Sequence, residues 1–533
     1  MDSLIASPLS IEVKTKNPPI HYFLLGLTTL GIAVLLAVFN GISVGYSNHS
    51  GLLPVVRRIV DLTYLPGDFN ITMRLYHHRG FAHLVAAFTS VFGEDRALIV
   101  LSVLSLVLLA GAILYLCRVL KLTLTWGALA GAFIALRVIW SGFGIEVNDF
   151  IGNPEVQPPI FAHALILIGL AALIEGKYRL PAFLAGIVLT IHLQIGLIFA
   201  LLLAPFYLVK RKPFGPKEIV RLAFIALVPA LPAFWHVAEM LQRGVNDSAF
   251  TLDYILFRIP HHFEPASAAN VVWVALHLVI QIICFIWMKR MRPDESPGLR
   301  TLMIVSLAST LLAILHLADF YYFRTLTFLK PQFLRFTPLI TVFGSLSLIT
   351  ALRAWADENK VLIGRLTFSH CVQAFLVVLI IDQGIARVQA NPPLYTFSVQ
   401  KYSDEESAWV QLCRWINQNG PKATYLTPPG HDGFTYLTNR STVVEFKINP
   451  DGALYLKEWY ERLNDLSGGV LPHERGFANI LPLDQAYAAL TSSQLMVLRQ
   501  KYQADYAVLP QSSRAQFPVL FQNADYRLVR LAE

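Results

Sequence analysis

Charged residues are scarce in this chain of 533 residues: Asp, Glu, Lys and Arg together make up 15% of it, while hydrophobic residues make up 55%. Soluble proteins carry about a quarter charged residues, so this balance excludes a single soluble fold and indicates a membrane protein. Cysteine is also rare, with four in the whole chain. These four are too scattered for a disulfide framework or a CxxC metal site.

Familiar nucleotide motifs are missing as well. The C-terminal part contains no GxGxxG, P-loop or GxSxG sequence, so we predict no nucleotide site there. The net charge of +8 could suggest nucleic acid. Most basic residues, however, lie in short loops between apolar runs, where they set the orientation of membrane helices, so nucleic acid is not a predicted partner.

Long apolar runs fill the chain between residues 21 and 386. A membrane span needs about 20 apolar residues. The candidate spans are 22–42, 97–117, 122–140, 158–174, 181–209, 221–239, 269–288, 301–319, 333–351 and 366–386. Lys14 and Lys16 precede the first run, and no small-residue cleavage site follows, so we expect an uncleaved first span.

The loops between the runs alternate in charge, which predicts their side of the membrane. Basic loops are placed in the cytoplasm, and acidic, aromatic loops outside. This rule places the loops 44–96, 141–157, 240–268 and 320–332 outside, together with residues 387–533, and places the N-terminus inside. The run 181–209 has basic residues at both ends, which favours two short passes, or a re-entrant hairpin, bent near His192 to Gln194. One tilted helix that breaks the charge rule is the alternative.

The expected fold class is a polytopic α-helical membrane protein, with about 11 passes, that carries a C-terminal exported α/β domain. The multispan domain would comprise residues 1–386, with a long first outer loop at 44–96. The extracytoplasmic domain would comprise residues 387–533. Within it, helices are predicted at 404–417, 452–463 and 493–502, and strands at 423–426, 441–446, 505–509 and 526–531. This alternation predicts a small, partly parallel sheet.

The first outer loop is the richest in chemistry. Arg57 and Arg58 could hold a phosphate, and Asp61 and Asp68 could serve as a general base or metal ligand beside the membrane. The turn that ends at Asp68 also reads as a plain turn with the Asp as a helix N-cap. The stretch 73–88 could form an amphipathic helix on the membrane surface.

Other outer loops add candidate binding residues. Asp149 and Glu155 are weak candidates for a divalent metal. Around the later spans lie Arg258, the adjacent His261 and His262, Arg324 and Arg335, which could contact a phosphate or hydroxyl groups. Interfacial histidines and a snorkelling arginine are the plainer interpretation.

The organisation resembles the GT-C superfamily of integral-membrane glycosyltransferases, over almost the whole chain. Four short segments also look like parts of uncharacterised bacterial multispan proteins; they are 64–68 (YLPGD), 258–262 (RIPHH), 331–335 (PQFLR) and 459–462 (WYER). The resemblance implies a polyprenyl-phosphate-linked sugar donor used at the outer leaflet. It also implies that an acidic residue of the first outer loop is the base or a metal ligand, with Asp68 the best match and Asp61 the second.

The leading hypothesis is therefore a GT-C-like glycosyltransferase of the bacterial inner membrane. Its expected partners are a lipid-linked sugar donor, membrane lipids and an unidentified acceptor. No cofactor is implied with certainty, and a divalent metal stays an open alternative. The second hypothesis is a non-catalytic membrane scaffold that presents a polymer- or partner-binding exported domain. A transporter ranks last, because the sequence has no internal repeat and few charges deep in its spans.

Overall fold

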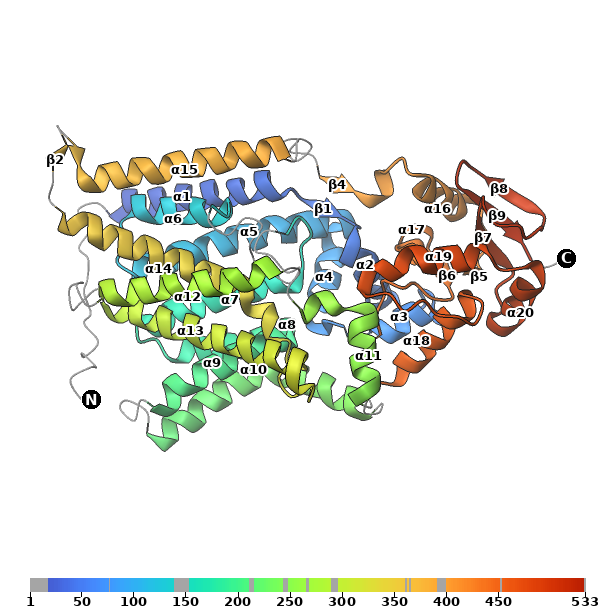
Figure 1. The fold of residues 1–533 in the computed structure, drawn as a ribbon, viewed down its shortest axis with the longest axis horizontal. Coiled ribbons are helices and arrows are strands. Elements are labelled where there is room, and N and C mark those ends of the chain that lie inside the picture. The colour runs from blue at the N-terminus through green and yellow to red at the C-terminus, as the bar shows by residue number, and fades with distance from the viewer. Residues whose placement is uncertain are drawn as a thin grey trace. The chain divides into compact units, whose positions relative to one another are not determined.

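The structure, a computed structural model, describes residues 18–75, 77–138, 153–209, 215–242, 248–264, 268–288, 296–359, 362–363, 366–390, 399–450 and 453–531. The chain divides into two compact units (Figure 1). The helical unit comprises Met1–Gly41, Ser102–Leu231 and His262–Ser398, and the mixed unit comprises Ile42–Leu101, Pro232–His261 and Val399–Glu533. The mixed unit therefore joins the C-terminal segment to two segments that the sequence analysis assigned to outer loops. The predicted boundary after residue 386 separates that segment from loops with which it shares a unit.

The helical unit is built from apolar helices. They are α1 (Pro18–Asn40), most of α5 (Glu94–Val119), α6 (Leu124–Ala135), α7 (Pro158–Ile174), α8 (Arg179–Ile191), α9 (Leu193–Val209), most of α10 (Pro216–Gln242), α12 (Ala268–Met288), α13 (Ser296–Ala318), α14 (Thr337–Glu358) and α15 (Phe368–Ala390). Among the described residues, six helices are long and apolar enough to cross a membrane, and five more apolar helices are shorter. The chain is thus a polytopic helical membrane protein.

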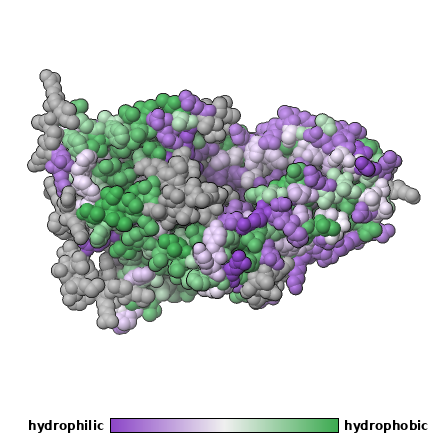
Figure 2. All heavy atoms as spheres, in the orientation of Figure 1, coloured by the Kyte–Doolittle hydropathy of each residue, from purple (hydrophilic) through white to green (hydrophobic). Residues whose placement is uncertain are grey.

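The outward faces of these helices are apolar. Phe23 of α1, Phe224 of α10 and Phe375 of α15 are each more than 60% exposed. The space-filling view shows the same: hydrophobic residues dominate the surface over the helical unit, and hydrophilic residues dominate the surface over the mixed unit (Figure 2). Apolar side chains that find no protein neighbour need a hydrocarbon environment, which a lipid bilayer supplies.

The run 181–209 forms two helices, as the charge rule favoured. Helix α8 ends at His192, whose backbone is extended, and α9 begins at Leu193. The two helices pack side by side, because a Cβ on Gly196 of α9 would lie 2.4 Å from the backbone nitrogen of Leu189 in α8. Only glycine permits this close approach. The alternative of one tilted helix is therefore wrong.

The mixed unit contains a five-stranded sheet with the order β6-β5-β7-β9-β8. Its strands are β5 (Thr424–Leu426), β6 (Ser441–Thr442), β7 (Tyr506–Pro510), β8 (Val519–Gln522) and β9 (Tyr526–Arg530). Strand β5 is parallel to β6 and β7, while β9 is antiparallel to β7 and β8. The predicted partly parallel sheet is present. Strand β8 was not predicted, and the predicted strand 441–446 was too long. Beyond Val443 the backbone turns away to bond with Asn70 and Pro429 instead.

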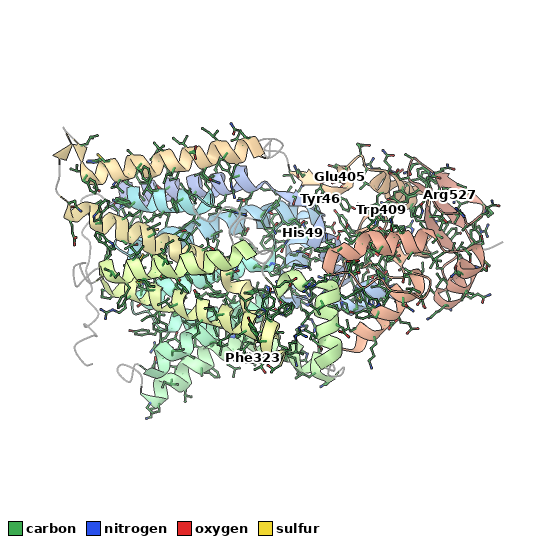
Figure 3. All side chains as sticks on the ribbon, in the orientation of Figure 1. Tyr46, His49, Phe323, Glu405, Trp409 and Arg527 are labelled. Atoms are coloured by element: carbon green, nitrogen blue, oxygen red, sulfur yellow. The ribbon has the colours of Figure 1, made fainter. Side chains whose placement is uncertain are left out.

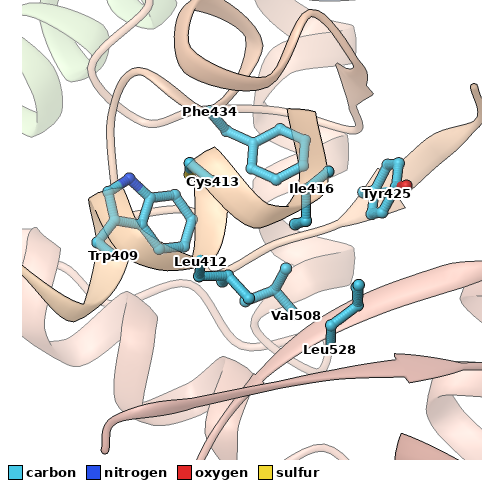
Figure 4. Close-up of a cluster of buried hydrophobic side chains, with 8 residues drawn as sticks. All are labelled: Trp409, Leu412, Cys413, Ile416, Tyr425, Phe434, Val508 and Leu528. Carbon is cyan, nitrogen blue, oxygen red and sulfur yellow. The ribbon is translucent and has the colours of Figure 1, made fainter. Parts of the chain in front are cut away.

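Helices cover this sheet. They are α16 (Ala408–Asn419), α17 (Phe434–Thr438), α18 (Ala453–Leu466), α19 (Ile480–Ala488) and α20 (Ser492–Tyr502). One face of α16 is apolar and packs into a buried cluster (Figure 4). The helix contributes Trp409, Leu412, Cys413 and Ile416, the strands contribute Tyr425, Val508 and Leu528, and α17 contributes Phe434. Helix α16 corresponds to the helix predicted at 404–417, whereas the short helices α17 and α19 were not predicted.

The first outer segment belongs to the mixed unit. It contains β1 (Ser43–Val44), α2 (Ser47–Val60), α3 (Phe69–Arg74) and α4 (Arg79–Phe92). Strand β1 pairs in parallel with β4 (Gln400–Lys401). The predicted amphipathic helix 73–88 is wrong in its extent, because the chain breaks before α4 at His78, which adopts the left-handed conformation with φ +46°. Helix α11 (Ser248–Arg258) and the 3-10 turn Pro260–His262 follow α10.

Short elements complete the chain. Strands β2 (Leu362–Ile363) and β3 (Leu366–Thr367) form an antiparallel pair. A π-helical turn at Asp319–Phe323 follows α13, and a 3-10 turn at Phe333–Phe336 precedes α14. Two further 3-10 turns, Tyr402–Asp404 and Gly476–Asn479, lie in the C-terminal segment.

Candidate functional site

The start of α2 is fixed to the C-terminal segment. The rings of Tyr46 and Tyr402 lie 5.2 Å apart, and Lys401 forms an ion pair of 2.6 Å with Asp95. His49 lies one turn into α2 and accepts a hydrogen bond from the amide of Gly45 at 3.3 Å. Tyr46 precedes α2 and His49 lies in its first turn, so both lie at the start of this helix (Figure 3). These contacts hold the first outer segment in a defined place within the mixed unit.

Arg57 is a structural cation whose charge is paired within the protein. Its Nε and Nη2 donate to the two carboxylate oxygens of Glu94 at 2.8 and 2.7 Å. Its Nη1 donates to the carbonyl of Tyr436 at 2.7 Å and to Asn439 at 2.8 Å. A bidentate pair of this kind is among the strongest side-chain contacts. The charge of Arg57 is thus already paired, and both Nη1 donors are used, so Arg57 is a poor candidate for a phosphate; it links α2 to α17 instead.

Asp68 caps α3. Its Oδ1 accepts the amide hydrogen bond of Ile71 at 2.8 Å, and its side chain is buried, with 1% of the residue exposed. Burial raises the pKa of Asp68 to about 6, although the Ile71 amide, Ser441 and the charge of Arg462 favour the ionised form. The interpretation of Asp68 as an N-cap is confirmed. Its predicted catalytic role is not excluded by these contacts, and it stays a prediction.

A second buried carboxylate lies in the same part of the unit. Glu445 accepts the amides of Gly433 at 2.8 Å and Thr435 at 3.2 Å, so it caps α17. Its own amide donates to Asn70 at 3.2 Å, next to Asp68 in sequence. Burial raises the pKa of Glu445 to about 8, and the charges of Asp432 and Asp68 add to this effect. Both carboxylates therefore serve the join between the first outer segment and the C-terminal segment.

The other two candidates of the first outer loop lie near the surface. Arg58 is half-buried and donates through Nη1 to the carbonyl of Tyr64 at 2.9 Å. Asp61 is exposed, ends α2, and accepts two hydrogen bonds from Thr63 at 2.9 and 2.7 Å. These two bonds lower the pKa of Asp61. Its carboxylate is thus an ordinary ionised turn residue.

Arg258 is a buried cation of a different kind. Only 3% of the residue is exposed, and its Nε and Nη2 donate to the carbonyls of Phe446 at 2.7 Å and Lys447 at 2.5 Å. Among the residues that the structure describes, Nη1 has no hydrogen-bond partner and no carboxylate forms an ion pair with Arg258. Burial, together with the charge of Arg74, lowers the pKa of Arg258 to about 10, although the charge of Asp432 acts in the opposite direction. A buried cation without a carboxylate is costly.

Aromatic rings hold Arg258 and His261 together. The Arg258 guanidinium carbon lies 5.1 Å from the ring of Phe446 and 5.0 Å from that of Phe477. His261 stacks on the same Phe477 ring at 4.9 Å. The turn Pro260–His262 is fixed in turn by Gly476, where a Cβ would lie 2.9 Å from the ring of Pro260. Arg258 and His261 thus share the Phe477 ring, and together with the buried Arg74 we call them the Arg258 site.

Arg74 completes the Arg258 site. It is 7% exposed, and its Nη1 donates to Asn449 at 3.1 Å. Two guanidinium groups close enough to affect each other's charge attract an anion with delocalised charge, such as phosphate. The sequence analysis named Arg258 and His261 but missed Arg74, because its partners lie almost 400 residues further along the chain. The adjacent acidic residues Glu94 and Asp95 were also missed, although both form ion pairs.

The remaining candidates lie in the helical unit. Arg324 is exposed and left-handed, with φ +52°, and its amide closes the π-helical turn on Asp319. Arg335 is half-buried, and its Nε contacts Gln332. His262 is half-buried at the end of its turn. The structure therefore brings Arg258 and His261 together in the mixed unit, whereas Arg324, Arg335 and His262 belong to the helical unit.

No metal group is formed within the described ranges of the chain: no three His, Cys, Asp or Glu side chains come together there. Glu155 is buried and accepts a hydrogen bond from Gln157 at 3.2 Å. Asp149, the other candidate ligand, lies outside the described residues. The possibility of a divalent metal stays a prediction.

Comparisons with known proteins support the fold. A family model described as "Domain of unknown function (DUF6798)" matches residues 407–466. No curated protein matches the sequence. The crystal structure of ArnT from Cupriavidus metallidurans in the apo state aligns over 97% of this chain and 99% of its own, with 12% identity and a TM-score of 0.50. The structure of the same protein bound to undecaprenyl phosphate aligns over the same shares, with 12% identity and a TM-score of 0.39. The alignment with the apo structure shows that the chain has a GT-C-like fold.

Proposed function

We propose that this protein transfers a sugar from a polyprenyl-phosphate-linked donor to an acceptor at the outer face of a bacterial inner membrane. The observation that carries the proposal is the GT-C-like fold over nearly the whole chain. The apolar surface of the helical unit supports a donor that reaches the enzyme through the bilayer. In this proposal the N-terminus is cytoplasmic and the mixed unit lies outside.

The donor phosphate would bind at the Arg258 site. A phosphate offers what Arg258 lacks among the described residues, namely an anion in direct contact and an acceptor for Nη1. Arg74 adds a second positive charge, and His261 can donate a further hydrogen bond when its ring carries the proton. The leaving polyprenyl phosphate gains negative charge during transfer, so preorganised cations favour the transition state over the bound donor. Arg58, Arg324 and Arg335 stay further candidates for phosphate contacts, and His262 stays a candidate for positioning.

The first-loop carboxylates have different places in this proposal. Asp68 orders the turn that leads into α3, so we assign it a positioning role, and a catalytic role requires that its buried carboxylate becomes accessible to the acceptor. Asp61 is accessible to an acceptor but is held in its own turn by Thr63. Activity measurements on these residues separate the two assignments, as described in the Discussion.

Binding of undecaprenyl phosphate to the full-length protein in nanodiscs tests the donor site. We expect the phosphate to raise the thermal midpoint, and undecaprenol, which lacks the phosphate, to leave it unchanged. Arg258→Gln should lose the shift, and Arg258→Lys should keep part of it because the charge remains. Arg499→Gln is the matched control, since Arg499 belongs to the same unit but is paired with Asp505 at 2.9 Å.

A structure of the same complex gives the decisive outcome. Density for the phosphate within hydrogen-bond distance of Arg258 supports the proposal. A phosphate bound elsewhere, or an equal shift with undecaprenol, overturns the assignment of this site. If Arg258→Gln fails to fold, Arg258→Lys and the density still decide.

A non-catalytic scaffold is the second candidate function. It is favoured by the use of Arg57 and Asp68 as internal contacts, which leaves the first outer loop without a free cation–carboxylate pair. A scaffold would bind its partner through the mixed unit and would show no transfer from any polyprenyl-phosphate sugar. Incubation of the protein with radiolabelled polyprenyl-phosphate hexoses and bacterial membranes distinguishes the two functions.

A further inference from the structure

The sheet of the mixed unit has a switch point between β5 and β7. After β5 the chain passes through α17 to β6 on one side of β5, and later through α18, α19 and α20 to β7 on the other side. Both neighbours are parallel to β5. In open α/β sheets, ligands bind outside the carboxyl ends of the strands where the strand order reverses in this way.

Three polar side chains meet at this edge of the sheet. His431 lies in the loop after β5, Asp484 lies in α19, and Tyr526 begins β9 opposite Pro510, the last residue of β7. The imidazole Nε2 of His431 lies 2.9 Å from the Tyr526 hydroxyl and 3.7 Å from Oδ2 of Asp484. The other oxygen of Asp484 accepts the amide of Gly430 at 2.7 Å. We call these three residues the His431 cluster.

The His431 cluster is held in place from behind. The Trp409 ring stacks on the imidazole at 4.6 Å, with 22° between the planes, and its indole nitrogen donates to the carbonyl of Asp432 at 3.2 Å. A Cβ at Gly430 would lie 2.6 Å from the Asp484 carboxylate, so glycine is needed where the loop meets α19. Side chains that are fixed in this way are preorganised for a ligand.

The His431 cluster is nevertheless open to solvent. The side chains of His431 and Asp484 are 32% and 19% exposed. Within the described part of the chain, Oδ2 of Asp484 has no polar contact nearer than the 3.7 Å to the imidazole, which is beyond hydrogen-bond range. This carboxylate oxygen can therefore accept a further hydrogen bond, and the Tyr526 hydroxyl, which uses one bond on the imidazole Nε2, can form another.

Charge limits the ligand. The carboxylates of Asp484, Asp432 and Asp525 all act on the His431 imidazole, while Lys447 pairs with Asp432 at 2.7 Å and so offsets part of their charge. An anionic group would be repelled here, whereas hydroxyl groups, which donate and accept at once, match all three side chains. An amine would be attracted as well. This chemistry is opposite to that of the Arg258 site.

We propose that the His431 cluster is a second binding site, which takes a neutral or amino sugar through its hydroxyl groups. Sugar binding at this cluster is independent of transfer. That the sugar is part of the acceptor rests on the proposed function. The two sites would then divide the substrates by charge, with the phosphate-bearing donor at Arg258 and the uncharged or basic acceptor at His431.

Saturation-transfer NMR on the full-length protein in nanodiscs tests the site with three probes: glucose, glucosamine and glucose 6-phosphate. We expect glucose and glucosamine to bind with a Kd of about 1 mM, and glucose 6-phosphate to bind about tenfold more weakly. His431→Gln and Tyr526→Phe should each weaken sugar binding about tenfold. His473→Gln is the matched control, because His473 is an exposed histidine of the same unit.

Diethyl pyrocarbonate labelling followed by mass spectrometry locates the bound sugar. Glucose, which has no amine that reacts with the reagent, should protect His431 and not His473. Equal binding of the three probes, unchanged binding in both variants, or labelling of His431 that glucose does not reduce would each overturn the second site. Undecaprenyl phosphate binding distinguishes this proposal from the proposed function. If the protein binds sugar but not undecaprenyl phosphate, only the donor site is contradicted. If it binds undecaprenyl phosphate but not sugar, only the His431 site is contradicted.

Discussion

Two arginines of the mixed unit show how similar residues reach opposite chemical states. Arg57 is part-buried and fully paired in charge. Glu94 neutralises its charge, and the Nη1 donors bond to two further acceptors. Arg258 is more deeply buried, and it forms no ion pair with a carboxylate among the described residues. A paired cation stabilises the fold, whereas an unpaired one is retained at a cost and indicates a ligand. Residue type alone therefore does not identify a phosphate site; the state of its donors does.

Breaking the closed pair should have the largest effect on stability. Arg57→Gln leaves Glu94 part-buried without its cation, and we expect a loss of about 3 kcal/mol in the free energy of unfolding. This corresponds to a fall of about 10 °C in the thermal midpoint of the purified protein. The double variant Arg57→Gln/Glu94→Gln should recover part of the loss. Arg499→Gln, at an exposed pair, should cost less than about 1 kcal/mol, and an equal loss there would contradict the special status of Arg57.

The buried carboxylate of Asp68 should make stability depend on pH. Its pKa in the fold is about 6, above the ordinary value of 3.8, so the folded protein holds the proton more tightly than the unfolded chain. Its contribution is therefore present below about pH 4 and is lost as pH rises through about 6. Asp68→Asn keeps the cap but cannot titrate, so at pH 8 it should be more stable than the wild type by about 2 kcal/mol, with no difference at pH 4. Unfolding midpoints across this range measure the effect.

The same variant decides the catalytic assignment. If Asp68 only positions α3, Asp68→Asn keeps transfer activity, because Asn accepts the Ile71 amide equally well. If Asp68 accepts a proton from the acceptor, activity falls while the thermal midpoint holds. Glu474→Gln, at an exposed position of the same unit, controls for loss of a negative charge.

The membrane helices could be predicted from the sequence because lipid imposes one local rule on every span. Runs of about 20 apolar residues and basic loops were enough to place the spans and to divide 181–209 near His192. The same local reasoning gave the long elements of the C-terminal segment, such as α16. It missed α17, whose five residues are capped by Glu445 from elsewhere in the chain. Short elements that depend on distant partners leave no periodic pattern.

The residue types of the candidate site could be predicted from the sequence, but which of its charges are paired within the protein could not. Arg57 and Arg258 both appeared as exposed-loop cations, and only the fold reveals that Glu94 closes one of them. The contacts of Arg57 with Tyr436 and Asn439 join positions about 380 residues apart, so no local pattern announces them. The His431 cluster likewise draws its three members from a loop, a helix and a strand, and none of them stood out singly.

Replacing the open arginine should cost less than breaking the closed pair, although Arg258 is the more deeply buried. Arg258→Met loses two hydrogen bonds to backbone carbonyls but also removes an uncompensated buried charge, so we expect a net loss of about 1 kcal/mol without ligand. The thermal midpoints of Arg258→Met and Arg57→Gln, measured in the same detergent, make the comparison. A larger loss for Arg258→Met would mean that its charge is already balanced inside the protein.

The smallest effect is expected at Asp61, the other predicted carboxylate of the first outer loop. Its side chain is exposed and bonds only within its own turn to Thr63, so Asp61→Asn should change the free energy of unfolding by less than about 0.5 kcal/mol. That neutrality makes transfer activity an unambiguous readout. A large fall in activity would make Asp61 the catalytic base and leave Asp68 to structure. Unchanged activity in both Asp61→Asn and Asp68→Asn would remove the first-loop carboxylates from the chemistry, and would favour the scaffold if no transfer is detected in the wild type.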